Sequence, residues 1–153
     1  MTMVDKIESL SDAALLGEFL DKAATENLAG ISHQPIEAGA ALRFFEAERE
    51  EAETGLWVVR DGERVLGVCL TGAWVAPLSG ERMASVLALY VEPNHRHQGL
   101  ARALVQAARS ELRARGILSL GARVEHNDDA RISMGERWGW TRGWEWLDSG
   151  AEA

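Results

Sequence analysis

One stretch of the sequence, from Ser85 to Val124, constrains the fold more than any other part of the chain. It opens with a nearly continuous apolar run that ends at Val91, as expected of a strand covered on both faces. A polar loop then leads into a helix from about Gly99 to Arg115, and a further strand is predicted over Ile117–Val124. The helix carries apolar residues at helical spacing, namely Leu100, Leu104, Ala108 and Leu112. A helix that joins two strands in this way makes a β-α-β unit, so we expect the two strands to be parallel.

The sequence before this unit predicts two helices, with a short strand ahead of them. Ser11-Asp12 is expected to cap a helix that runs to about Thr25, and Ile7 and Leu10 would end the first strand. After a loop over Gly30–Pro35, a second amphipathic helix with an acidic tail is predicted from Ile36 to about Glu53.

Three strands are then predicted to follow one another as an antiparallel meander. The first two, Leu56–Val59 and Arg64 to about Trp74, flank Asp61-Gly62, which is a strong hairpin-turn signal. The turn Pro77–Gly80 leads into the third strand, which is the apolar run that ends at Val91.

The C-terminal region continues the alternation of helix and strand patterns. Asp128 or Asp129 is expected to cap a helix that ends near Arg137, and residues 139–147 predict a strand pair or a strand ending. This alternation indicates a mixed α/β fold, and a length of 153 residues suits a single domain over residues 1–153.

Composition excludes several classes of protein. A formal net charge of -8 argues against broad nucleic-acid binding, which needs a basic face, and can steer a cationic substrate towards the protein. No apolar stretch approaches the ~18 residues of a membrane span, and the N-terminus lacks the apolar core of a signal peptide, so we expect a cytoplasmic protein with no membrane partner. The single cysteine, Cys69, excludes an intrachain disulfide and is expected to be buried. The four histidines show no close metal-ligand spacing with it, so no metal site is predicted.

The loop Arg96–Ala101 has the composition of an anion-binding helix start. A helix N-terminus leaves backbone N–H groups unpaired and carries partial positive charge, so a pyrophosphate fits there. Gly99 and Ala101 are small enough for a close approach, and Arg96 can add charge-assisted contacts. Taken alone, these residues also suit an ordinary turn and cap. Their spacing matches neither a Walker loop nor the dinucleotide fingerprint G-x-G-x-x-G.

The wider context resembles motif A of the GCN5-related N-acetyltransferase (GNAT) superfamily. That motif is written Q/R-x-x-G-x-G/A and follows a strand that often reads L-x-V-x-P. The matching residues here are Leu89, Val91, Pro93, Arg96, Gly99 and Ala101. The order of the predicted elements also resembles the family over nearly the whole chain. The resemblance implies a central, mostly antiparallel sheet with a splayed parallel strand pair, flanked by helices.

The resemblance further implies acetyl-CoA as the co-substrate, attacked directly by a neutral amine. The CoA pyrophosphate would be held by Arg96 and by the backbone N–H groups of His97, Gln98, Gly99, Leu100, Ala101 and Arg102. The strand edge at Leu89, Tyr90 and Val91 would pair with the pantetheine arm, and a backbone N–H near Val91 would polarise the thioester carbonyl. Asn127 would contact pantetheine or phosphate, although a helix cap beside Asp128 explains it equally well.

The general acid departs from the family pattern. In relatives a tyrosine in the last helix often protonates the departing thiolate, but the only tyrosine here is Tyr90. The corresponding position falls on Met134 when counted from Asn127, and on Gly135 when counted back from the glycine after the helix. The general acid would then be Ser133 or a water molecule, or the thiolate would leave without a general acid.

The general base is sought at the end of the predicted parallel strand, because sites of α/β proteins form there. Glu125 and His126 follow that strand, and Glu125 is the first candidate. Both residues also suit a solvated surface.

Four tryptophans, Trp138, Trp140, Trp144 and Trp146, cluster near the C-terminus. They suit sheet and core packing, a homodimer surface, or an aromatic wall of the acceptor pocket. Together these features predict an N-acetyltransferase that acts on a primary amine, with a cationic small molecule favoured over a protein N-terminus or lysine. The missing tyrosine supports the alternative, a non-catalytic acyl-CoA-binding or regulatory module.

Overall fold

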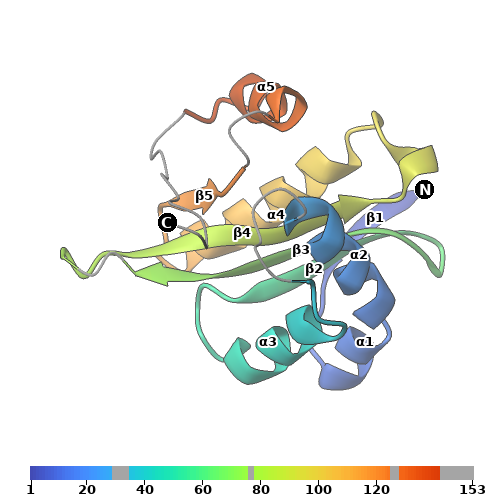
Figure 1. Ribbon diagram of the computed structural model, residues 1–153, viewed down its shortest axis with the longest axis horizontal. Helices are drawn as coiled ribbons and strands as arrows, with labels where there is room; N and C mark the ends of the chain where they lie inside the picture. Colours follow the sequence, from blue (N-terminus) through green and yellow to red (C-terminus); the bar gives the residue numbers. More distant parts are fainter. Residues whose placement is uncertain (29–34, 76–77, 125–127, 142–153) are drawn as a thin grey trace.

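The computed structural model describes residues 1–28, 35–75, 78–124 and 128–141. Its five strands form one sheet in the order β1-β2-β3-β4-β5 (Figure 1). The strands are Thr2–Lys6 (β1), Gly55–Asp61 (β2), Arg64–Val75 (β3), Arg82–Val91 (β4) and Leu120–Ala122 (β5). All neighbours are antiparallel except β4 and β5, which are parallel, so the sheet is mixed as predicted.

Helices flank this sheet and complete an α/β fold. They are Leu10–Ala14 (α1), Gly17–Leu28 (α2), Ala40–Glu48 (α3), Leu100–Ala114 (α4) and Asp129–Arg137 (α5), with a single 3₁₀ turn at Pro93–His95 (η1). Figure 1 shows α1, α2 and α3 grouped on one side of the sheet and α4 on the other. Among the described helices, none has both the length and the apolar character needed to cross a membrane.

The alternation of side chains along the strands divides the core into two halves. On β2, Leu56 and Val58 pack with the apolar side chains of α1, α2 and α3, whereas Trp57 and Val59 pack with those of α4. Because both faces of the central strands are covered, their sequences are apolar at successive positions rather than at every second one. Cys69 lies on the α4 side and is fully buried, as expected from its sequence context.

The N-terminal helices are shorter than the sequence predicts. The helix predicted from Ser11 to Thr25 is two helices, because the chain turns between Ala14 and Gly17. The first of them, α1, is capped by Ser9, whose side chain accepts a hydrogen bond from the Asp12 backbone at 3.1 Å. Leu15, at this turn, is exposed, although Leu15, Leu16, Phe19 and Leu20 are spaced as one apolar side of a continuous helix.

The helix predicted over residues 36–53 is also shorter, since α3 covers only Ala40–Glu48. Gly39 precedes α3 in a left-handed conformation (φ +80°), which a side chain rarely adopts, and its N–H donates to Asp21 at 2.8 Å. At its other end α3 stops at Glu48, and Glu53 is buried just before β2. The sequence had placed Glu53 in the acidic tail of the helix.

The meander β2-β3-β4 follows the prediction closely. Asp61 pairs with Arg64 across a turn in which Gly62 has a φ of +61°. The first strand, β1, lies earlier than predicted and ends at Lys6, so Ile7 and Leu10 follow it rather than belong to it.

The crossover from β4 through α4 to a parallel β5 is confirmed, but β5 is shorter than Ile117–Val124. Gly116 follows α4 in a left-handed conformation, which agrees with the helix end predicted at about Arg115. Asp128 caps α5, also as predicted. The loop at residues 30–34 and the strand predicted beyond residue 141, with Trp144 and Trp146, lie outside the described residues.

Candidate active site

Strand β4 has two edges with different partners. Its backbone pairs with β3 along its length, whereas β5 pairs with it only from Ala84 to Val86. A bulge follows at Leu87, since Val86 lies opposite Thr71 and Ala88 lies opposite Leu70. From residue 87 to residue 91 no described strand pairs with β4 on its β5 side. We call this segment the open edge of β4.

Hydrogen-bond alternation decides which backbone groups of β4 face the open edge. The Glu92 N–H donates to the Leu66 carbonyl of β3 at 2.8 Å, so every second residue before it also faces β3. Tyr90 therefore directs its backbone groups towards β3, while those of Leu89 and Val91 face the open edge. Of the three residues predicted to pair with pantetheine, only these two lie with their backbone on that edge.

Both residues on the open edge already have partners within the protein. The Leu89 N–H donates to the side-chain oxygen Oδ1 of Asn27 at 2.7 Å, and the Val91 carbonyl accepts from Nε of Arg96 at 2.8 Å. Asn27 comes from the end of α2 and was not singled out by sequence reasoning. Only its polar character in the last turn of an amphipathic helix hinted at a role.

Arg96, the first residue of the motif, is held by three groups of the protein. Besides the Val91 carbonyl, its guanidinium contacts Glu26 at 2.7 Å and lies 5.5 Å from the centre of the Tyr90 ring. A contact from Arg96 to phosphate stays a prediction.

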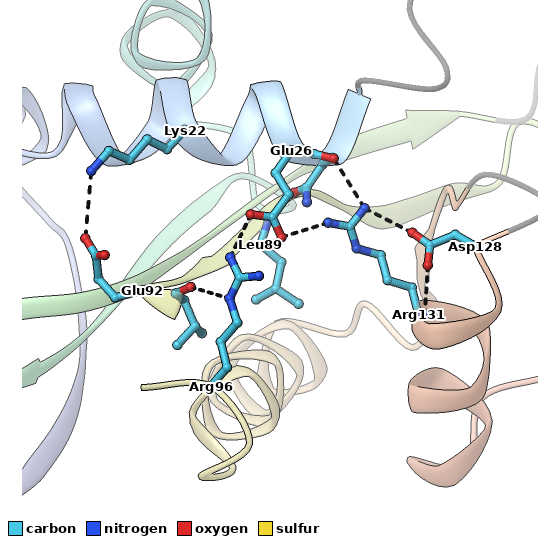
Figure 2. A network of polar contacts seen from close by, with 9 residues as sticks. Lys22, Glu26, Leu89, Glu92, Arg96, Asp128 and Arg131 are labelled. Atoms are coloured by element: carbon cyan, nitrogen blue, oxygen red, sulfur yellow. Dashed lines mark hydrogen bonds and ion pairs between the residues drawn. The ribbon is translucent and has the colours of Figure 1, made fainter. Parts of the chain in front are cut away.

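Glu26 links three separate parts of the fold, as Figure 2 shows. Its carboxylate pairs with Arg96 from the loop after β4 and, at 3.1 Å, with Arg131 of α5. Arg131 also pairs with Asp128 at 3.3 Å, and Lys22 of α2 lies 3.8 Å from Glu92. The end of α2, which carries Asn27, is therefore tied to both the loop and α5.

The loop between η1 and α4 adopts an unusual backbone. His97 has a φ of +64° and Gly99 a φ of +81°, so two residues in the left-handed region stand on either side of Gln98. For a histidine this conformation is uncommon and often marks a functional loop. The sequence predicted the glycine but gave no signal for the histidine.

Helix α4 begins without a side-chain cap. Gly99 occupies the cap position and makes no side-chain hydrogen bond, so helix geometry leaves the N–H groups of Leu100, Ala101 and Arg102 without an intrahelical acceptor. By contrast, Asp128 caps α5 through a hydrogen bond from the Arg131 backbone at 3.1 Å. The start of α4 is thus a set of backbone donors with partial positive charge, suited to an anion.

Two of the three predicted catalytic residues, Glu125 and His126, and one predicted CoA contact, Asn127, lie outside the described residues. Ser133 is exposed on α5, and its role as an acid stays a prediction. In the described ranges there is no group of three or more His, Cys, Asp or Glu side chains that could hold a metal ion.

Two of the clustered tryptophans are placed by the structure. Trp138 and Trp140 are half-buried and pack against the α4 half of the core. Together with side chains of α4, including Arg102 and Arg109, they line a cavity of about 30 Å³. For these two residues packing is therefore the observed role.

The mixed sheet, whose parallel strands pair only briefly, and the flanking helices agree with the fold that the motif A resemblance implied. A family model described as the acetyltransferase (GNAT) family matches residues 18–140. The chain therefore belongs to the GNAT family, as its motif predicted.

Individual relatives agree with this assignment. Over 102 residues the chain is 32% identical to mycothiol acetyltransferase from Geodermatophilus obscurus, a match that covers 66% of this chain and 33% of that protein. The chain thus spans about a third of the length of this curated relative. A structure of a predicted acetyltransferase with acetyl-CoA from Clostridium acetobutylicum is similar with a TM-score of 0.78 and 16% identity, covering 98% of this chain and 96% of that one. An aminoglycoside acetyltransferase from an uncultured soil sample, in complex with sisomicin, has a TM-score of 0.70 and 12% identity, covering 96% and 93%.

Proposed function

We propose that this chain is an N-acetyltransferase that transfers an acetyl group from acetyl-CoA to a primary amine by direct attack. The observation that carries the proposal is the uncapped start of α4 beside the open edge of β4. Backbone donors at one point and an extended strand edge next to it suit a ligand with a pyrophosphate and a long amide-containing arm. Membership of the GNAT family supports the same co-substrate.

In this proposal the loop and the helix start bind and orient, and they do no covalent chemistry. The N–H groups of residues 97–102 hold the pyrophosphate, and the open edge aligns the pantetheine arm. The amine nitrogen, after losing a proton to Glu125, His126 or a water chain, bonds to the thioester carbon as the carbon–sulfur bond breaks, and then gives up its second proton to become the amide nitrogen. The thiolate leaves with the bonding electrons and takes up a proton from Ser133 or water, which the second proton from the nitrogen replaces.

For the acceptor we propose a cationic small molecule. The net charge of -8 supports it, because an acidic protein concentrates cations at its surface. The similar soil enzyme, an aminoglycoside acetyltransferase whose structure is a complex with sisomicin, supports the same choice. A protein N-terminus or lysine is the alternative acceptor to be tested beside it.

The experiment that tests this function is thermal unfolding with and without excess acetyl-CoA, with NADH and ATP as controls. A ligand that binds only the native state stabilises it by ~2.7 kcal/mol at a hundredfold excess over its dissociation constant. We expect stabilisation by acetyl-CoA alone, followed by release of CoA thiol when the right amine is added. Absence of any shift at millimolar acetyl-CoA would contradict the proposal, and binding without turnover across aminoglycosides, polyamines and peptides would favour a non-catalytic module.

A further inference from the structure

Of Leu89 and Val91, the two residues whose backbone groups face the open edge of β4, Leu89 lies further from the loop. Val91 lies next to the loop and its carbonyl is used by Arg96, whereas Leu89 lies one step further along the strand, towards the point where β5 joins at Val86. An arm anchored at the start of α4 and extended along this edge reaches Leu89 with its far end. In acetyl-CoA the far end is the acetyl thioester, which carries a carbonyl oxygen.

The same N–H is already bound by an oxygen of a side chain. Asn27 presents its amide oxygen Oδ1 at 2.7 Å from the Leu89 nitrogen, in the position that a carbonyl acceptor of a ligand would take. A half-buried strand amide without an acceptor is costly, so the Asn27 oxygen stabilises the strand edge when no ligand is there. One N–H cannot make a full hydrogen bond to both oxygens at once.

The structure also explains why Asn27 is held at this place. Glu26, the residue before it, is paired with Arg96 on one side and Arg131 on the other. These two ion pairs hold the last turn of α2 against the loop and α5 (Figure 2). In this position the next side chain, Asn27, contacts β4. Asn27 is 62 residues from Leu89 in sequence, so the contact depends on this docking.

We infer that Asn27 is a specificity-determining residue that sets the preference of the site between acetyl-CoA and CoA. The acetyl carbonyl takes the Leu89 N–H by displacing the Asn27 oxygen, and Asn27 returns to it once the acetyl group has left on the amine. CoA has no acetyl carbonyl, so it binds with the Asn27–Leu89 hydrogen bond in place. This inference rests on the proposed function, since it takes acetyl-CoA as the ligand.

The test compares the dissociation constants of acetyl-CoA and CoA by titration calorimetry for the wild type, Asn27→Ala and Asn27→Asp. Removing the competing oxygen in Asn27→Ala is expected to tighten acetyl-CoA binding about three- to tenfold, the range of one net hydrogen bond, with CoA binding within about twofold. Asn27→Asp offers a stronger acceptor and moves the ratio of the two constants in the opposite direction. Alanine favours helix, so α2 is expected to persist.

The ratio separates this role from a merely structural one, because damage to the shared part of the site weakens both ligands alike. Thr25→Ala removes an exposed hydroxyl on the same turn, which donates to the Asp21 carbonyl at 2.9 Å. It serves as the matched control and leaves the ratio unchanged. An unchanged ratio in both Asn27 variants overturns the inference. If the wild type binds neither acetyl-CoA nor CoA, the proposed function itself fails, and the two failures are thereby distinguished.

Discussion

The two ends of the sheet differ in whether their polar groups have partners within the protein. Where β2 and β4 begin, the Glu53 carboxylate is only 3% exposed and accepts hydrogen bonds from Nε and, at 2.8 Å, from a terminal nitrogen of Arg82. Where β4 ends, the first N–H groups of α4 have no side-chain cap, and His97 and Gly99 hold left-handed conformations. The chain completes the first end by itself, whereas we propose that a ligand completes the second. Changes at the first end should therefore alter stability, and changes at the second should alter binding.

The largest expected effect is on acetyl-CoA binding, from a negative charge placed at Gly99, before the start of α4. Gly99→Asp is expected to weaken acetyl-CoA binding about a hundredfold relative to Gly99→Asn, since two like charges about 4 Å apart repel by several kcal/mol near a protein surface. Asparagine has the same shape, no charge and a tolerance for the left-handed region, so it controls for the backbone. A Cβ at this position meets nothing within 4 Å, so we expect both variants to fold. Equal dissociation constants for the two variants would show that no anion binds there.

The second prediction concerns the buried carboxylate of Glu53, at the end of the sheet where β2 and β4 begin. Glu53→Gln is expected to lower the free energy of unfolding by about 1–2 kcal/mol, because it weakens the hydrogen bonds to a half-exposed Arg82. Glu51→Gln is the matched control, since Glu51 is itself half-exposed and lies 3.3 Å from the same guanidinium. It should cost less than about 0.5 kcal/mol. Urea unfolding measures both, and a changed acetyl-CoA affinity in either variant would break the division between the two ends.

The third prediction is a pH dependence confined to the same end. Hydrogen bonds from Arg82 hold the pKa of Glu53 below its ordinary range despite its burial. The unfolded chain therefore takes up a proton at Glu53 at a higher pH than the native protein does. The contribution to stability is complete above the unfolded pKa and is lost as the pH falls through the native pKa. Glu53→Gln should flatten the decline in stability below about pH 5, while Glu51→Gln should leave it in place.

The smallest effect is expected in the loop before α4. His97→Gly relieves a left-handed conformation that disfavours a side chain, but it also makes the unfolded chain more flexible, so a net stabilisation of about 0.5 kcal/mol is expected. Gln98→Gly is the control, because within the described chain His97 is the only residue other than glycine with a positive φ. Calorimetric unfolding that finds the two variants equally destabilised would mean that His97 carries no such strain.

Local signals explain which parts of this fold were predictable. The hairpin at Gly62, the helix end at Gly116 and the crossover to β5 each depend on neighbours within a short stretch, and all three agree with the structure. The break between α1 and α2 was missed, because the apolar spacing continues across the turn at Leu15 even though that side chain is exposed.

The candidate site divides in the same way. The motif from Arg96 to Ala101 is contiguous, so the sequence alone could place it after a strand and before a helix. Asn27 acts on a residue 62 positions away, and Glu26 on one 105 positions away. Such contacts form only when α2 docks on β4 and α5, so the residue spacing within one segment of the sequence cannot predict them.

The burial of Cys69 has a practical consequence. Burial raises the pKa of this thiol to about 12, so near neutral pH it is neither ionised nor reachable in the native protein. As the only cysteine in the chain, it leaves the folded protein silent towards chromogenic disulfide reagents. Such a reagent added to the native protein would record only thiol released from a thioester. Without acetyl-CoA, the reagent would react with Cys69 only after a chain unfolds, so the rate of colour formation would measure the rate of global unfolding.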